Sequence, residues 1–186
     1  MATNTSFKQT DFTRTALDSD YDACEFVNCA FPEIRFGKIG FENCRFVQCN
    51  FSLCRMDTTT WSDVQFIDCK MTGIDFSRCN PYTLSMTFQH SQLQYAIFSA
   101  LNLQGIHFTE CNLQEADFSE TNLKGAKFVE CDLARAIFSS TNLEKADLST
   151  SFNYIIDPVT NRLRQARFSR EGLAGLVASF GIVLVD

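Results

Sequence analysis

Large apolar residues recur at every fifth position along most of this chain. The series runs in register from Phe26 to Phe76, slips by two residues, and resumes from Phe88 to Leu148. With a looser extension at Phe7 and Phe12, it includes sixteen of the nineteen phenylalanines. A helix repeats every 3.6 residues and a strand every 2, so neither places every fifth residue on one side. The period therefore predicts a backbone that turns a corner after each five residues.

The residue two positions before each centre of this series is small or apolar almost throughout, and the other three positions are mostly polar. Two inward and three outward positions per quintet indicate a solenoid of short turns that bury their faces against one another. Phe and Leu centres alternate after Phe88, and Asn102, Asn122 and Asn142 recur every twenty residues. We therefore favour four quintets per coil with like residues stacked, while other multiples of ten stay open.

About 27 quintets at four per coil, with the usual ~4.8 Å strand spacing, predict about seven coils and a rod about 34 Å long. Burial of each centre stabilises the fold by roughly 1.5–3 kcal/mol before entropy, spread along the whole axis. The residues predicted to form the core include Phe41, Phe46, Phe98, Leu103, Phe108, Phe118, Leu123, Phe128, Phe138 and Leu143.

Two breaks interrupt the register. Leu17 to Phe26 is nine residues, one short of two quintets, and Phe76 to Phe88 is twelve, two too many. Pro81 lies in the second break and cannot donate to a β-ladder, so it marks a corner or a small loop. Such a loop on a rigid scaffold can carry function; the alternative interpretation is a tolerated bulge.

All nine cysteines fall two residues before a position of the series, where a small inward side chain is expected. Their number is odd and no CxxC motif occurs. We predict buried free thiols, as in a cytosolic protein. The cysteines expected to stack between coils, at near disulfide range, are Cys24 with Cys44, Cys29 with Cys49 and Cys69, and Cys111 with Cys131.

Composition and motifs argue against an enzyme. We find no Gly-rich phosphate loop, no G-x-S-x-G motif and no His paired with a nucleophile. His90 and His107 are expected to be plain surface residues, so a zinc site with four converging ligands is not predicted, and no cofactor is expected. No apolar run reaches the ~20 residues of a membrane span, and no signal peptide is evident, so a cytoplasmic location is expected.

The net charge of −6 disfavours nucleic acid as a ligand, because duplex affinity comes largely from Lys and Arg. From Ser151 onward the chain has three acids and four bases, which leaves 19 acids against 12 bases, or −7, on the repeat body. Between Cys79 and Asn122 there is no Lys or Arg. The acidic residues predicted to face a partner are Glu110, Glu115, Asp117, Glu120, Glu130 and Asp132.

The series ends at Leu148, which divides the chain into a repeat domain, 1–150, and a C-terminal segment, 151–186. Ser169 is a good N-cap for a helix, Gly181 is its expected stop, and the apolar residues 182–185 then predict a short strand. This apolar segment either caps the open end of the coil in a monomer or forms a two-fold dimer interface, which we favour. The predicted dimer residues are Leu173, Leu176, Val177, Phe180 and Ile182.

The repeat resembles the pentapeptide-repeat family, whose consensus is small, Asn or Asp, Leu or Phe, polar, any. The best matches are 116–120 (Ala-Asp-Phe-Ser-Glu), 121–125 (Thr-Asn-Leu-Lys-Gly) and 141–145 (Thr-Asn-Leu-Glu-Lys), and the resemblance covers Cys24 to Thr150. It implies an all-β fold, a right-handed quadrilateral β-helix.

The C-terminal segment resembles the topoisomerase-protecting branch of this family, which includes the Qnr-type quinolone-resistance proteins and the albicidin-resistance protein. The matching residues are Asn153-Tyr154, Ile156-Asp157, 166–169 (Ala-Arg-Phe-Ser) and the segment from Leu173 to Ile182. In that branch the C-terminal segments form the dimer interface. The branch also carries longer loops, where this chain has only the slip near Pro81.

These observations favour a non-catalytic rod that binds another protein. The resemblance implies that its partner is DNA gyrase or topoisomerase IV, engaged by an acidic surface that mimics DNA, with resistance to a gyrase-directed drug or toxin as the outcome. The alternative is a structural or scaffolding module with an unrelated protein partner. Neither hypothesis involves a membrane or binding to nucleic acid.

Overall fold

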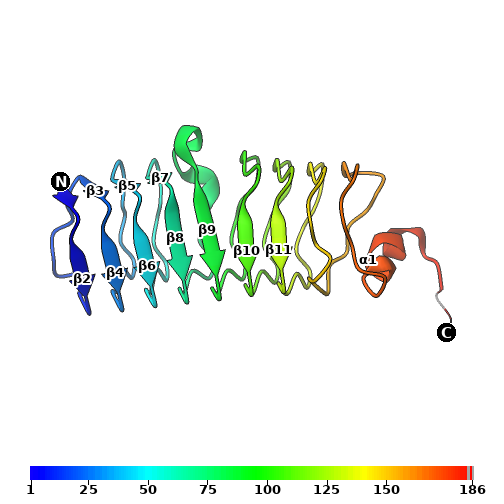
Figure 1. The fold of residues 1–186 in the computed structure, drawn as a ribbon, viewed down its shortest axis with the longest axis horizontal. Helices are drawn as coiled ribbons and strands as arrows, with labels where there is room; N and C mark the ends of the chain where they lie inside the picture. The colour runs from blue at the N-terminus through cyan, green and yellow to red at the C-terminus, as the bar shows by residue number, and fades with distance from the viewer. Residues whose placement is uncertain (184, 186) are drawn as a thin grey trace.

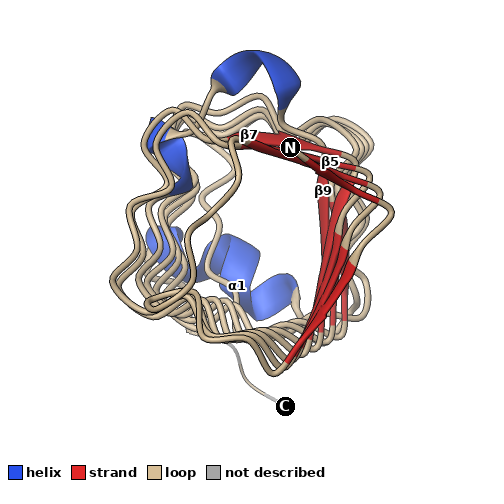
Figure 2. Ribbon diagram, turned by 90° about the vertical axis from the view of Figure 1, so that its left-hand side faces the viewer, coloured by secondary structure: helices blue, strands red, loops and turns tan. Residues whose placement is uncertain are grey.

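The computed structural model describes residues 1–183 and 185. The chain forms a straight rod of stacked coils with the N-terminus at one end and a small helical segment at the other (Figure 1). Viewed along its axis, each coil has four sides, and strands occupy two adjacent sides (Figure 2). The quadrilateral β-helix expected from the five-residue period is confirmed, as is the right hand that the family resemblance implies.

All the strand pairs are parallel and form two sheets, one of four strands in the order β1-β3-β5-β7 and one of seven in the order β11-β10-β9-β8-β6-β4-β2. The strands are β1 (Ala2–Thr3), β2 (Ser6–Lys8), β3 (Asp20–Asp22), β4 (Glu25–Val27), β5 (Gly40–Glu42), β6 (Arg45–Val47), β7 (Thr60–Ser62), β8 (Val64–Ile67), β9 (Met86–Gln89), β10 (His107–Thr109) and β11 (Lys127–Val129). The helical turns are η1 (Phe76–Arg78), η2 (Pro81–Thr83), α1 (Leu173–Val177) and η3 (Ala178–Phe180).

The register establishes that four quintets make one coil. Phe26 pairs with Phe46, and Phe108 pairs with Phe128, twenty residues on. The predicted asparagine stack is also present: the Asn122 amide donates to Asn102 at 2.8 Å and accepts from Asn142 at 3.0 Å. Because adjacent coils carry the same residue type at the same place, each side-chain hydrogen bond extends the backbone ladder.

The core is a set of stacked rings. Phe26 lies over Phe46 with ring centroids 4.5 Å apart, and Phe98 lies over Phe118 at 5.1 Å with the rings 3° from parallel. Rings from different sides meet edge to face, as Phe108 and Phe118 do at 6.0 Å. Both geometries suit the quadrupole of an aromatic ring. All ten of the core residues named from the sequence are buried.

The two register breaks have different structural outcomes. Leu17 lies one residue out of step, and Tyr21 takes the buried position on this side of the coil. The first coil is therefore one residue shorter than an ordinary coil of twenty. The second break lengthens one coil to 22 residues, because Phe66 pairs with Phe88. The extra length is taken up at η2, which projects from the rod (Figure 1), and the Asn80 side chain accepts from the Tyr82 amide at 3.2 Å.

The β-helix extends beyond the boundary at residue 150 that the sequence indicates. Arg162 bridges to Asn142, and Arg167 bridges to Asp147, each after one further coil of twenty residues. In this coil the positions of Asn153 and Pro158 break the apolar series, and the buried Tyr154 and Ile156 fill the core instead. The apolar series does not reveal this coil, because two of its four sides are filled by residues that lie outside the five-residue register.

The predicted C-terminal helix is present but begins at Leu173, with Gly172 rather than Ser169 at its N-cap. The strand predicted after it is not found. The Ser169 hydroxyl accepts from the Gly172 amide at 3.0 Å, and Gly181 ends the helical segment with a left-handed φ of 63°. Ile182, Val183 and Val185 are exposed and are in no strand; Leu184 lies outside the described residues. The strand prediction is therefore wrong for the part of this stretch that the structure describes.

The nine cysteines are buried and free, as predicted. The Cys44 thiol donates to the Tyr21 carbonyl at 3.5 Å, and the Cys54 thiol donates to the Phe31 carbonyl at 2.6 Å. Burial raises the pKa of Cys44 to about 11 and the pKa values of Cys54 and Cys79 to about 12, because an apolar interior disfavours the thiolate. Within the described residues, no helix is long and apolar enough to cross a membrane.

Candidate protein interface

One corner of the rod carries a column of charged side chains. The corner lies directly after strands β8, β9, β10 and β11, and its residues are Asp68, His90, Glu110 and Glu130. Each of these four has a positive φ between 48° and 53°. This conformation turns the chain toward the next side of the coil, and the parallel register places the four residues on successive coils. We call these residues, together with the neighbouring Asp132, the acidic edge.

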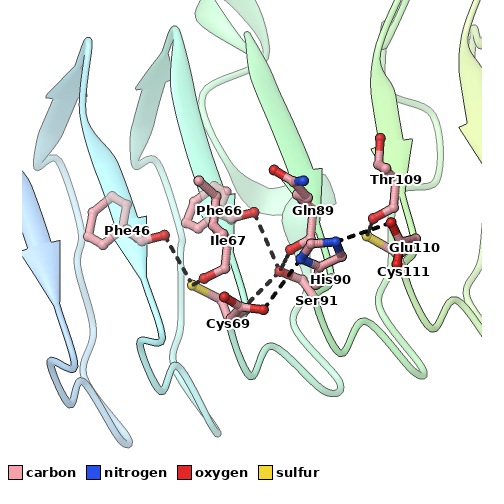
Figure 3. A network of polar contacts seen from close by, with 11 residues as sticks. Phe46, Phe66, Ile67, Cys69, Gln89, His90, Ser91, Thr109, Glu110 and Cys111 are labelled. Atoms are coloured by element: carbon pink, nitrogen blue, oxygen red, sulfur yellow. Dashed lines mark hydrogen bonds and ion pairs between the residues drawn. The ribbon is translucent and has the colours of Figure 1, made fainter.

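His90 lies between two carboxylates of this edge. Its Nδ1 is 3.5 Å from Asp68 Oδ1, and its Nε2 is 3.2 Å from Glu110 Oε1 (Figure 3). The imidazole therefore lies between two carboxylates that are two coils apart. His90 is exposed, as expected from the sequence, and its ring also contacts both neighbouring acids.

Glu110, Glu130 and Asp132 line one open depression of about 630 Å³, together with Asn112, Thr150 and Phe152 among others. Asp132 Oδ1 accepts from the Asn153 amide at 2.9 Å and from the Ala134 backbone amide at 3.1 Å, and Oδ2 accepts from Gln114 at 2.5 Å. Partial burial acts to raise the pKa of Asp132, but these hydrogen bonds outweigh it and the pKa is lowered. The carboxylate is thus held charged and in a fixed position.

The other three acids named from the sequence lie elsewhere on the coil. Glu115 is at the next corner, where it pairs with Arg135. Asp117 lies on the following side, and its carboxylate accepts from the Ser119 amide at 2.8 Å. Glu120 is exposed at the corner after that. The structure therefore brings Glu110, Glu130 and Asp132 together and separates them from Glu115, Asp117 and Glu120.

Sequence reasoning did not include Asp68 and His90 in this surface. The signal that could have found them is the two-residue slip near Pro81. It lengthens one coil to 22 residues, so Asp68 aligns with His90, and His90 then aligns with Glu110 after an ordinary coil of twenty. Counting by twenty alone would have placed Asp68 beside Phe88.

The residues predicted for a dimer interface lie on the C-terminal helical segment. Leu176 packs against the core. The helical segment is also joined to the last coil, because the Ile156 backbone amide donates to the Gly175 carbonyl at 3.0 Å. Val177 is half-buried. Leu173, Phe180 and Ile182 are exposed by 52%, 53% and 56%, which is unusual for large apolar side chains beside a finished core.

Glu110, Glu130 and Asp132 of the acidic edge lie on the outside of the rod, in an open depression. In the described part of the chain, no group of three or more His, Cys, Asp or Glu residues is arranged to hold a metal ion. A column of carboxylates on a rigid scaffold attracts a basic partner surface.

Comparison with known proteins identifies the repeat. A family model described as a pentapeptide repeat region matches residues 19–85 and 83–148, which is more than half of the chain. The chain belongs to the pentapeptide-repeat family. No curated protein matches it.

Several solved structures share this pentapeptide-repeat fold. A trypsin-treated form of QnrB1, a plasmid-mediated fluoroquinolone resistance protein, is 17% identical, with a TM-score of 0.56 and coverage of 100% of this chain and 99% of the other. Full-length QnrB1 is 14% identical, with a TM-score of 0.53 and coverage of 97% and 99%. Identities this low show a common fold and leave the partner to be established.

Proposed function

We propose that this pentapeptide-repeat protein is a non-catalytic binding rod of the cytoplasm, and that it engages a type II topoisomerase, DNA gyrase or topoisomerase IV, through the acidic edge. The carrying observation is the column from Asp68 to Glu130, which presents carboxylates along the axis as a nucleic-acid backbone presents phosphates. An enzyme that holds DNA in a basic channel offers the complementary surface. Protection of that enzyme from a quinolone or a similar drug is the associated activity.

Two further observations support this proposal. The QnrB1 match extends over the whole chain, including the C-terminal segment that the repeat alone does not require. The nine free thiols suit a reducing compartment such as the cytoplasm.

We also propose that two copies pair through the C-terminal segment. Leu173, Phe180 and Ile182 form an apolar surface that a second copy would cover, and two-fold pairing is the commonest way to bury such a surface. Leu173→Asp or Phe180→Asp is expected to give a monomer. Multi-angle light scattering checks this, and a mass equal to that of the wild type would reject the interface.

The main experiment measures supercoiling by DNA gyrase with and without the protein, in the presence and absence of a quinolone or albicidin. The double variant Glu110→Lys/Glu130→Lys is expected to need at least about tenfold more protein for the same effect, because it reverses charge at the centre of the edge. The control Glu33→Lys/Glu120→Lys makes the same change in net charge at other corners. No effect of the wild type at micromolar concentration, or equal losses in both variants, would refute the proposal.

The second candidate is a scaffolding module with an unrelated protein partner, and the charge density of the edge favours it. Duplex DNA carries nearly three charges per ~4.8 Å of axis. The acidic edge carries about one acid per coil, and His90 occupies one of the four column positions. Two results together would support this candidate. The protein has no effect in the topoisomerase assays, and a protein partner that is recovered with the wild type is lost in the acidic-edge variants.

A further inference from the structure

The side of the rod that carries β1, β3, β5 and β7 is oppositely charged at its two ends. We call this side face A; it continues through Leu103, Leu123, Leu143 and Leu163 on later coils. At its N-terminal end, Asp20, Asp22 and Glu42 line a depression of about 340 Å³, which also contains Lys38 and Met1, whose ammonium pairs with Asp18 at 3.0 Å. Gly40 also lines this depression, and a Cβ at this position would lie 2.8 Å from Asp20 Oδ1.

The C-terminal end of face A is basic. Arg162 bridges to Asn142 on the adjacent coil, and the Arg164 carbonyl accepts from the Lys145 amide at 2.9 Å, so these bases lie on neighbouring coils. Lys124 lies one coil earlier, with Glu144 as the single acid among them. Arg162, Arg164, Lys124 and Lys145 take part in no ion pair within residues 1–183. A patch of net charge +3 thus lies on a protein of net charge −6.

Between the two charged ends, face A carries a projection and a hollow. The projection is η2, which rises above β7 in Figure 2, and its Tyr82 side chain is 92% exposed. The hollow has a volume of about 170 Å³ and is lined by Leu84, Ser85, Gln104, Gly105 and His107 among others. It opens at the opposite margin of face A, where the chain turns toward β9 and β10.

A single symmetry operation brings the charged ends, the projection and the hollow of two copies together. A two-fold axis perpendicular to face A, passing between Tyr82 and the hollow, moves Tyr82 of one copy onto the hollow of the other. The same axis places the basic end of each copy against the acidic end of its partner. An isologous contact requires self-complementarity of this kind, in which knob meets hole and acid meets base at both ends.

We propose that face A is a docking surface for a second copy of this chain, in which the two rods pair antiparallel. Arg162 and Arg164 of one copy face the depression formed by Asp20 and Asp22 of the other. This contact is separate from the C-terminal interface and from the acidic edge. The pairing weakens as salt rises, because exposed charges are screened beyond a Debye length of about 10 Å at 0.1 M.

Other occupants of face A have weaker support. A nucleic acid would meet the basic end, but it would be repelled by the acidic end of the same face and by the net charge of the whole protein. A small acidic peptide would leave Tyr82 and the hollow without a role. A second copy accounts for all of these features at once.

Site-specific cross-linking tests the proposal. Tyr82→Cys copies are mixed with Gln104→Cys copies under a glutathione disulfide buffer, which supplies the oxidant for the new bond. The native thiols are buried, so the introduced thiols are the reactive ones. A disulfide-linked pair is expected at low salt, with a yield at least about tenfold lower at 0.5 M salt. Leu53→Cys, exposed on another side of the rod, replaces Gln104→Cys as the control and is expected to give no specific product.

A charge exchange gives an independent test. Asp20→Arg/Asp22→Arg copies and Arg162→Glu/Arg164→Glu copies should each lose the cross-link, and a mixture of the two should regain it. The matched control Arg35→Glu/Arg55→Glu changes two exposed arginines of another side and should leave the yield unchanged. A cross-link that survives either charge variant alone, or is absent from the wild-type background, would overturn the proposal.

Both tests are repeated with Leu173→Asp, which separates this contact from the C-terminal interface. If Leu173→Asp lowers the molecular mass seen by light scattering but keeps the cross-link, the face A contact is supported. This conclusion does not depend on the result of the topoisomerase assays. Duplex binding by the wild type in fluorescence anisotropy, lost in Arg162→Glu/Arg164→Glu and accompanied by no cross-link, would instead assign the basic end to nucleic acid.

Discussion

The N-terminal and C-terminal halves of the β-helix fill the same four-sided coil with different residues. From Phe26 to Phe66 nearly every side carries an aromatic ring, and Phe46 alone contacts six other rings. From Phe88 to Phe138 rings occupy two opposite sides and leucines the other two, and Phe118 contacts four rings. The positions two before the centres are mostly Cys or Ile in the first half and more often Ala or Thr in the second.

This difference shows that the fold depends on the period of the apolar positions more than on their identity. Both halves keep parallel ladders in the same sheet without interruption. The aromatic half concentrates its packing in side chains with many ring neighbours, whereas the Phe and Leu half adds polar ladders such as Asn102, Asn122 and Asn142. The two halves should therefore respond differently to the loss of a core ring, to alkali and to the loss of a polar ladder.

The largest expected effect is the loss of a ring from the aromatic half. Phe46→Ala should lower the free energy of unfolding by about 5 kcal/mol, at the top of the range for buried phenylalanines, and Phe118→Ala by about 3. The reason is the larger number of rings that lose a neighbour around Phe46. Urea unfolding followed by far-UV circular dichroism measures both, and equal losses would contradict the packing difference.

Alkali should destabilise the aromatic half first. The pKa values of Cys44 and Cys54, both in this half, are raised in the folded state to about 11 and 12, from 9.0 for the free group. The unfolded chain therefore loses protons first, and each thiol lowers stability by about 1.4 kcal/mol per pH unit above pH 9 until its folded pKa is reached.

Trp61 is buried in the aromatic half, so its fluorescence reports that half. In an alkaline titration its emission should shift before the far-UV signal is lost, because coils contact mainly their neighbours. The Cys54→Ala variant should have a shallower dependence of stability on pH above 9. Simultaneous loss of both signals, with the same slope in the variant, would count against this prediction.

The polar ladder of the second half should give the smallest effect. Asn122→Ala removes hydrogen bonds to Asn102, Asn142 and the Lys124 amide, and should cost about 1–2 kcal/mol. At the matching place in the first half, Thr60 accepts one side-chain bond, from Asn80, and Thr60→Ala should cost under about 1 kcal/mol. Thermal unfolding measures the loss of stability in both variants. A larger loss for Thr60→Ala than for Asn122→Ala would contradict the stronger polar ladder assigned to the second half.

Much of this molecule follows from the one-dimensional pattern. A period of five with Asn every twenty favoured the four-sided coil and predicted the stacked phenylalanines and the inward cysteines, because each coil packs only on its neighbours and contacts recur at a fixed separation. By the same count of twenty, Glu110 aligns with Glu130, and Asn112 with Asp132. Within an unbroken register, contact partners can be counted from the sequence.

Tertiary structure decided whatever depends on departures from that register. The slip near Pro81 aligns Asp68 with His90 and lifts Tyr82 away from the rod, and the last coil recruits Tyr154 and Ile156 from positions outside the series. The physical reason is that the period records which residues point inward, whereas the side of the rod that an outward residue occupies depends on the cumulative length of every coil before it.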